Sequence, residues 1–175
     1  MLVGPPGAGK TRLAKRISRI LAVSFIDTDK AIVAEHGPIA TIFETQGEAA
    51  FRQLERAEIV RALATDSIVS LGAGAVINTD TQADLANHRV ALITVTAEAV
   101  AGRIGGPKRP LATDIGAWTA LVDSRIEIYE RLAHVSWDTS VRPIDTIAAE
   151  IAEWLIAHPT DLPLTTHDDQ PGAPQ

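Results

Sequence analysis

The sequence contains no cysteine, and only 4% of its 175 residues are aromatic. Without cysteine the protein forms no disulfide and performs no thiolate chemistry, which is compatible with a reducing compartment. No apolar run approaches the roughly 20 residues that cross a bilayer. A glycine-rich stretch follows the first three residues and leaves no room for a signal peptide. We therefore expect a cytoplasmic protein that does not associate with membranes.

Positive charge is also scarce, because 16 Lys and Arg residues are outnumbered by 22 Asp and Glu residues. A nucleic-acid-binding surface requires a basic excess, so we expect no nucleic-acid partner. Small anionic ligands remain compatible, since they need only a local cluster of cationic side chains. The length and the 46% hydrophobic content predict one globular domain over residues 1–157. Residues 158–175 are rich in Pro, Asp, Thr and Gln, and we expect a disordered tail there.

Short β-branched runs alternate with stretches of helical periodicity along the chain. The runs at 67–72 and 90–95, SIVSLG and VALITV, are typical of strands buried in parallel sheets. Apolar residues at helical spacing predict a helix behind the glycine-rich stretch and further helices over 48–64, 118–133 and 144–157. This alternation predicts an α/β fold with a parallel sheet covered on both faces.

One short segment is highly specific. Residues 4–11, GPPGAGKT, match the G-x-x-x-x-G-K-[ST] pattern of a phosphate-binding P-loop. Its glycines let successive backbone N–H groups converge on phosphate oxygens at a helix N-terminus. Lys10 would reach the β- and γ-phosphates, and the Thr11 hydroxyl would ligate Mg²⁺. The apolar MLV before the loop is too short for a full central strand.

Two carboxylates stand one residue apart in FIDTDK, residues 25–30, where a short apolar run ends. Taken alone, Asp27 and Asp29 are most simply turn or cap residues, because Asp favours such positions. A bound nucleotide gives them a second interpretation. If the chain is still extended there, both side chains point to one side, about 6–7 Å apart. One acid would then hold the water shell of Mg²⁺, and the other would accept the hydrogen bond or proton of an attacking hydroxyl.

Several segments, in this order and spacing, resemble the shikimate kinase family: GPPGAGKT, DTD, IFETQGEAAFRQLE and SLGAGAV, followed by a basic KRPL stretch. The resemblance runs from the first residues to about residue 157. It implies a P-loop kinase fold with a five-stranded parallel sheet, a substrate lobe over about 29–62 and a lid near 104–115. It also implies ATP-dependent phosphorylation of the shikimate 3-hydroxyl in aromatic amino-acid biosynthesis. The implied cofactor is Mg²⁺, the partners are ATP and shikimate, and the protein would be a monomer.

The resemblance assigns roles to residues at matching positions. Asp29 resembles the acid that binds the ring hydroxyls and serves as base, while Asp27 resembles an outer-sphere Mg²⁺ residue. The implied catalytic set is Lys10, Asp29 and Arg109, in which Arg109 would stabilise charge on the transferred phosphoryl group from the lid. The implied metal residues are Thr11 and Asp27. The residues implied to contact ATP are Gly7, Ala8, Gly9, Lys10, Thr11, Arg12, Arg103, Arg109, Arg142 and Pro143, with Arg103 and Pro143 around the adenine.

The residues implied to bind the acceptor are Asp29, Arg52, Gly72, Ala73, Gly74 and Arg125. Arg52 and Arg125 would hold the shikimate carboxylate through paired guanidinium N–H bonds, and Glu55 resembles a family acid near them. Without the family pattern, the preferred interpretation of Arg52 is an ion pair with Glu48 or Glu55 on an exposed helix face. Arg125 could likewise be an ordinary surface arginine. Ala73 replaces the usual middle glycine of the family, and its N–H stays available if φ is negative there.

Two alternatives remain open. A sugar-acid kinase similar to gluconate kinase would use the same fold, and a nucleotide-binding regulatory protein would have lost turnover. The intact set of Lys10, Asp29, Arg52, Arg109 and Arg125 argues against the second alternative. The basic segment at 105–112, GGPKRPLA, could be a mobile loop without a role in closure. Packing on apolar faces, rather than stacking on a base, is expected of the tryptophans Trp118, Trp137 and Trp154.

Overall fold

The computed structural model describes residues 1–104 and 115–158. Within them, one sheet is formed by parallel strands in the order β2-β3-β1-β4-β5. The strands are β1 (Leu2–Val3), β2 (Ser24–Asp27), β3 (Ser67–Ser70), β4 (Ala91–Thr94) and β5 (Val135–Asp138). The expected α/β fold with a five-stranded parallel sheet is confirmed. The central strand β1 is only two residues long, as the short MLV segment predicts.

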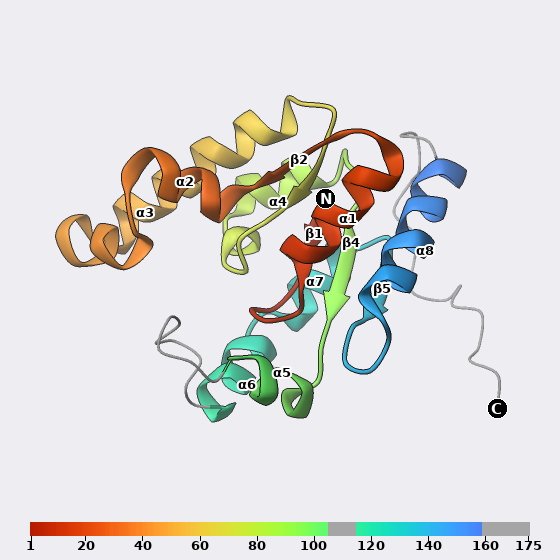
Figure 1. Cartoon of the computed structure of the whole chain (residues 1–175). Coiled ribbons are helices and arrows are strands. Elements are labelled where there is room, and N and C mark those ends of the chain that lie inside the picture. Colours follow the sequence, from red (N-terminus) through yellow and green to blue (C-terminus); the bar gives the residue numbers. More distant parts are fainter. Residues whose placement is uncertain (105–114, 159–175) are drawn as a thin grey trace.

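Helices cover both faces of the sheet. They are α1 (Lys10–Leu21), α2 (Thr28–His36), α3 (Ile39–Leu63), α4 (Thr79–Leu85), α5 (Ala97–Ile104), α6 (Ile115–Asp123), α7 (Ile126–Leu132) and α8 (Ile144–Ala157), with a 3-10 turn η1 (Ala75–Ile77). Figure 1 shows α1 and α8 packed side by side, with the end of α3 and α4 on the opposite side of the sheet. An ion pair between Arg16 and Asp145 links α1 to α8.

The core consists of two apolar layers, one on each face of the sheet. Neighbouring strand residues point to opposite faces, so each strand supplies both layers. Leu2 and Ile93 pack against α1 and α8, whereas Val3 and Leu92 pack with side chains of α3 and α7. These four side chains are buried in both layers, since each is at most 3% exposed. Continuous apolar strands such as VALITV are explained by this two-sided cover.

The helix predicted over 48–64 is confirmed as the second half of α3. Gly47, at φ 82° and ψ 169°, breaks α3 into two helical segments, and the second of them begins after this glycine. The positive φ suits glycine, which has no Cβ to clash. The helix predicted over 144–157 is confirmed as α8.

The single helix predicted over 118–133 is wrong, because α6 ends at Asp123 and α7 begins at Ile126. The Ser124 hydroxyl donates to the Leu121 carbonyl at 2.8 Å, a local bond that competes with helix continuation. Arg125 then leaves the helical region at φ −129° and ψ −11°. Because of this break, the Arg125 side chain does not follow the direction of either helix and can reach the turn after β3.

Most of the expected lid, including Lys108 and Arg109, lies outside the described residues, as does the expected tail from residue 159 onward. The domain boundaries expected from the sequence therefore stay a prediction. Among the helices of the described ranges, none combines the length and the apolar character that a bilayer span requires.

Candidate active site

The predicted P-loop connects β1 to α1 at the carboxyl end of the central strand, where ligands of open α/β sheets bind. Gly7 and Gly9 adopt φ of 82° and 89°, values that favour glycine. Lys10 is 8% exposed, and its Nζ donates to the carbonyls of Gly4 and Pro5 at 2.7 and 3.0 Å. The loop thus folds around its own lysine, whose ammonium group is held by two loop carbonyls.

Thr11 and Asp27, the two expected metal residues, lie in direct contact. Thr11 Oγ1 donates to Asp27 Oδ2 at 2.5 Å. Asp27 Oδ1 accepts the Lys30 backbone N–H at 3.0 Å and so caps the N-terminus of α2. The cap interpretation of Asp27 is confirmed by one oxygen, while the other oxygen contacts Thr11 of α1, and the metal role of Asp27 stays a prediction. A hydroxyl and one carboxylate beside a phosphate site fit Mg²⁺, which is commonly bound by few protein ligands plus phosphates.

The extended geometry considered for Asp27 and Asp29 is wrong. The strand ends at Asp27, and α2 begins at Thr28, so Asp29 lies in the first helical turn and diverges from Asp27. Its carboxylate reaches the turn after β3, where a Cβ at Gly72 would lie only 2.4 Å from Asp29 Oδ1. The glycine is needed here because a side chain would displace the acid.

Thr28, between the two acids, holds the β3 end in place, and sequence reasoning missed it. Its fully buried hydroxyl accepts the Gly72 N–H at 3.1 Å and donates to the Ser70 carbonyl at 3.4 Å. It therefore fixes the start of α2 against the glycine turn that Asp29 faces. A small polar residue at the carboxyl end of a parallel strand was the available signal.

The surroundings of Arg52 include both acids of its own helix and the turn after β3. It forms ion pairs with Glu48 at 3.1 Å and Glu55 at 2.6 Å along α3, as the surface interpretation predicts. Its guanidinium also faces the glycine turn, since a Cβ at Gly74 would lie 2.4 Å from Arg52 Nη1. The Arg52 guanidinium is thus held by two acids of its own helix and faces the turn at residues 72–74.

Glu55 is 4% exposed and lies between charged groups of this cluster. Burial raises the pKa of its carboxyl, the hydrogen bond and charge of Arg52 oppose that rise, and the charge of Asp29 adds to it. Because the titration of Glu55 responds to Asp29, Arg52 and Arg125, these four groups share one electrostatic environment.

Arg125, at the break between α6 and α7, points to the same turn. Its Nη1 donates to the Ala73 carbonyl at 3.2 Å, and the buried Tyr129 hydroxyl donates to the same oxygen at 2.7 Å. Ala22 is the one non-glycine residue of the described ranges at positive φ, so Ala73 keeps an ordinary negative φ. Alanine therefore fits this turn without backbone strain.

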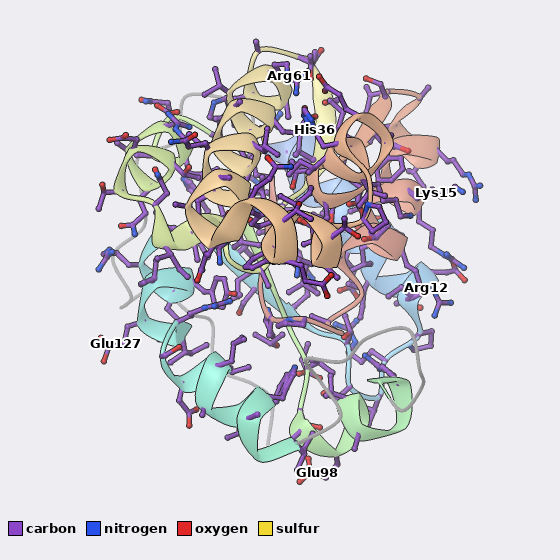
Figure 2. The ribbon with its side chains drawn as sticks, turned by 90° about the vertical axis from the view of Figure 1, so that its left-hand side faces the viewer. Arg12, Lys15, His36, Arg61, Glu98 and Glu127 are labelled. Atoms are coloured by element: carbon purple, nitrogen blue, oxygen red, sulfur yellow. The ribbon has the colours of Figure 1, made fainter. Side chains whose placement is uncertain are left out.

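The other residues expected to contact ATP are more scattered. Arg103 of α5 donates to the Thr139 and Ser140 carbonyls at 2.6 and 3.3 Å, so its guanidinium contacts the segment before α8. Arg142, in the same segment, forms an ion pair with Glu150 of α8. Pro143 directly precedes α8, as its N-cap. Arg12 is exposed, and Figure 2 places it at the edge of the molecule, near Lys15.

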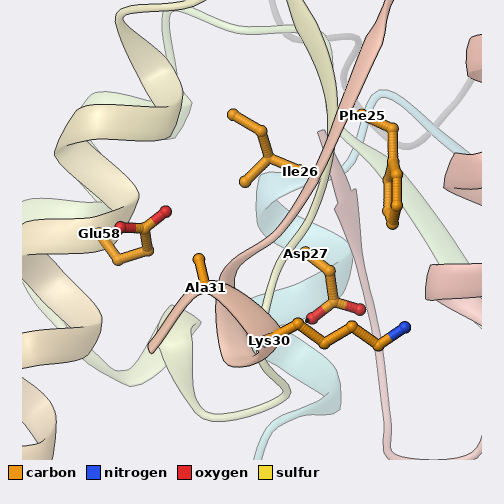
Figure 3. Close-up of a pocket in the computed structure, with 6 residues that line it drawn as sticks. All are labelled: Phe25, Ile26, Asp27, Lys30, Ala31 and Glu58. Carbon is orange, nitrogen blue, oxygen red and sulfur yellow. Dashed lines mark hydrogen bonds between the residues drawn. The ribbon is translucent and has the colours of Figure 1, made fainter. Parts of the chain in front are cut away.

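A hollow of about 370 Å³ lies beside β2 and the start of α2, lined by Phe25, Ile26, Asp27, Lys30, Ala31 and Glu58. Figure 3 shows apolar side chains of β2 along it and the Asp27 and Lys30 side chains next to one another. The lining residues include none of Asp29, Arg52, Glu55 and Arg125, the charged groups around the turn at residues 72–74, which we call the acceptor cluster. Within the described residues, no group of three or more His, Cys, Asp or Glu side chains is arranged to hold a metal ion.

A P-loop on the central strand of a parallel sheet, with a charged cluster at the end of the neighbouring strand, defines the class of P-loop kinases that act on small molecules. The sequence profile of the shikimate kinase family matches residues 6–156. The shikimate kinase of Thermobifida fusca is 39% identical over 162 residues, which cover 90% of this chain and 94% of that protein. The chain belongs to the shikimate kinase family and is an ATP-dependent kinase that phosphorylates a hydroxyl group.

Solved structures agree with this assignment. A shikimate kinase from Acinetobacter baumannii in complex with shikimate superposes with a TM-score of 0.81 at 27% identity, covering 89% of this chain and 91% of that one. A gluconokinase from Sinorhizobium meliloti has a TM-score of 0.55 at 17% identity, covering 89% of this chain and 94% of that one. The second likeness shows the fold alone, so the comparisons favour the shikimate kinase over the gluconate kinase alternative.

Proposed function

We propose that the protein transfers the γ-phosphoryl group of ATP to the 3-hydroxyl of shikimate. One observation carries this proposal: Asp29, Arg52 and Arg125, from three separate elements, converge on the turn at Gly72–Gly74. That turn follows β3, which neighbours β1 and its P-loop in the sheet. A carboxylate-bearing polyol bound at the turn would have arginines for its carboxylate and an acid for its hydroxyl, next to the phosphate site.

In this mechanism the protein mainly positions its substrates and neutralises charge. Backbone N–H groups of the P-loop bind the phosphates. Lys10 exchanges its hydrogen bonds to the loop carbonyls for contacts with oxygens of the β- and γ-phosphates. Thr11 and Asp27 would hold Mg²⁺, which would offset the negative charge of the phosphates. Asp29 accepts the hydrogen bond, and then the proton, of the attacking hydroxyl.

Arg52 and Arg125 bind the acceptor carboxylate, and the Gly72–Gly74 backbone approaches the ring. The lid arginine Arg109 remains the proposed stabiliser of the transferred charge, and Arg103, Arg142 and Pro143 the proposed surroundings of the adenine. We also propose that the active unit is a monomer, as the family resemblance implies.

A coupled assay of ADP release with shikimate, quinate and gluconate tests the proposal. We expect efficient turnover of shikimate alone and loss of turnover when EDTA removes Mg²⁺. Preferred turnover of gluconate would make the protein a sugar-acid kinase. ADP binding without turnover of any acceptor would instead indicate a regulatory nucleotide-binding protein.

A further inference from the structure

Four carbonyl oxygens of the P-loop accept hydrogen bonds from side-chain donors, and two of these donors come from distant parts of the chain. Lys10 binds the first two of these carbonyls. The Trp118 indole Nε1 donates to the Pro6 carbonyl at 2.9 Å, and the Thr139 hydroxyl donates to the Ala8 carbonyl at 2.9 Å. Both residues are buried, at 4% and 2% exposure, and stand 112 and 131 positions from their acceptors.

Each of these bonds also sets the direction of an N–H group. The peptide bond is planar, and in the trans form its C=O and the following N–H point in opposite directions. The described chain contains no cis peptide bond. When Trp118 holds the Pro6 oxygen outside the loop, the N–H of Gly7 points inward. When Thr139 holds the Ala8 oxygen, the N–H of Gly9 does the same.

Glycine makes such external support necessary. Gly7 and Gly9 lack a Cβ and can occupy several backbone conformations at similar free energy, so the loop sequence alone fixes the peptide directions weakly. Burying the donors excludes water as a competing partner for the carbonyls. The side chains that carry the donors pack in the core, with Trp118 in the layer around α1 and α8.

We propose that Trp118 and Thr139 are positioning residues that aim the N–H groups of Gly7 and Gly9 at the phosphates of the nucleotide. The inference rests on the proposed role of the P-loop in binding ATP. Neither side chain touches the phosphates, since each acts through the peptide group whose oxygen it holds. Trp118 was expected only to pack, and nothing in the local sequence marked Thr139.

Thr139 has a second contact that the test must separate. Its hydroxyl carries one proton, for which the Ala8 carbonyl at 2.9 Å competes with the Thr94 carbonyl at 3.1 Å. The same oxygen accepts a hydrogen bond from Arg103 Nη1 at 3.2 Å. A loss of binding through Arg103 would act on the adenine end of the nucleotide, whereas a loss through Ala8 would act on the phosphates.

The experiment compares ADP with adenosine, which lacks the phosphates, in equilibrium titrations of the full chain. For Thr139→Val and Trp118→Phe we expect ADP affinity to fall about 5- to 30-fold, as when a buried carbonyl loses its donor. Adenosine affinity should change less than about 2-fold, and shikimate affinity without nucleotide should not change. Thr139→Ser keeps the hydroxyl and should restore most of the ADP affinity.

Matched variants control for lost packing and lost hydrogen bonds elsewhere. Trp137→Phe removes an indole that donates to Glu150 at 3.1 Å, and Thr81→Val removes a buried hydroxyl that has no hydrogen-bond partner in the structure. Both should bind ADP like wild type. Thermal melting of each variant verifies that it is folded.

Three outcomes would overturn the inference: wild-type ADP affinity in both test variants, equal losses for ADP and adenosine, or equal losses in the control variants. Failure of the proposed function gives a different result, because wild type itself would then not bind ADP or not release it with shikimate. If Trp118→Phe does not fold, Thr139→Val and Thr139→Ser decide the matter alone.

Discussion

The two sides of the site are built from different materials. On the phosphate side, residues 4–11 offer backbone N–H groups, and their carbonyls are held by two neutral donors and Lys10. On the acceptor side, the turn at 72–74 is surrounded by charged side chains from α2, α3 and the α6–α7 break. The phosphate side thus consists of oriented backbone peptide groups, and the acceptor side consists of a network of charged side chains.

This difference has an energetic consequence. Peptide dipoles that are already aligned lose little on binding, which is the advantage of preorganisation. The ionic network instead satisfies itself in the free protein, because Arg52 already binds Glu48 and Glu55. In the proposed complex, a carboxylate ligand would share Arg52 with these acids, so part of its attraction would be offset by the contacts it replaces. Substitutions on the phosphate side should act on turnover and on nucleotide affinity, and those on the acceptor side should act on shikimate affinity and on the pH dependence of stability.

The largest effect is expected for Lys10→Ala. The ammonium group is the one cation of the described P-loop, and its loss should lower kcat by about 10³-fold, as for a lost charge-stabilising donor. Shikimate binding without nucleotide should stay unchanged, because Lys10 lies on the other side of the site. Steady-state kinetics and calorimetry measure the two effects. Lys15→Ala, on the exposed part of the same helix, is the control and should retain turnover. A Lys10→Ala variant that lost shikimate binding as well would show that the two sides are not separate.

An intermediate effect is expected for Arg52→Ala. Loss of one charge-assisted pair in a partly buried site should weaken shikimate binding about 10- to 150-fold, with ADP affinity unchanged. Arg52→Lys should recover only part, since an ammonium cannot reproduce the paired geometry of a guanidinium. Titration calorimetry measures both affinities.

Arg61→Ala is the matched control for that substitution. Arg61 lies further along α3, and it also pairs with two acids, Glu35 at 3.0 Å and Glu58 at 2.9 Å. Because the Arg61 side chain is exposed, its pairs should contribute at most about 1 kcal/mol each to stability and nothing to the acceptor site. If Arg52→Ala bound shikimate like the Arg61→Ala protein, Arg52 would be a surface ion-pair residue only.

The contrast between the two sides also explains what the sequence could predict. The P-loop is contiguous and its function lies in its backbone, so the GPPGAGKT pattern was sufficient to place Gly7 to Thr11. The strand–helix alternation likewise predicted the parallel sheet, because buried strands leave a continuous apolar signal.

The rest depends on contacts between distant segments, which no local pattern encodes. At the break before Arg125, the Ser124 hydroxyl makes a local bond and Arg125 contacts the distant turn at Ala73, whereas apolar periodicity alone continued the predicted helix through this point. The divergence of Asp27 and Asp29 follows from a helix start that their spacing could not fix. Thr28 and Thr139 were missed because the backbone groups that their hydroxyls bind belong to segments far away in the sequence.

The smallest expected effect concerns the pH dependence of stability. Burial raises the pKa of Glu55 above its usual value, so the folded state binds this proton more tightly than the unfolded state does. A group of this kind contributes stability at low pH that is lost as the pH rises through its folded pKa. Arg52 limits the loss by pairing with the carboxylate. Arg52→Ala removes that partner, so the pKa of Glu55 should rise further, and the variant should lose more stability near pH 8 than near pH 5.

Thermal melting of wild type and variants at both pH values measures this effect. We expect the loss in Tm of Arg52→Ala to be larger at the higher pH by about 2–4 °C, which corresponds to roughly 1 kcal/mol for a chain of this size. Thr139→Val alters the phosphate side without touching an ionisable group of the acceptor cluster, so its loss in Tm should be the same at both pH values. In the double variant Arg52→Ala with Glu55→Gln, the pH dependence should disappear, because the buried carboxyl is gone. If the pH dependence persisted in that double variant, another group would be responsible for it. Glu55 would then not control the pH response of the acceptor side.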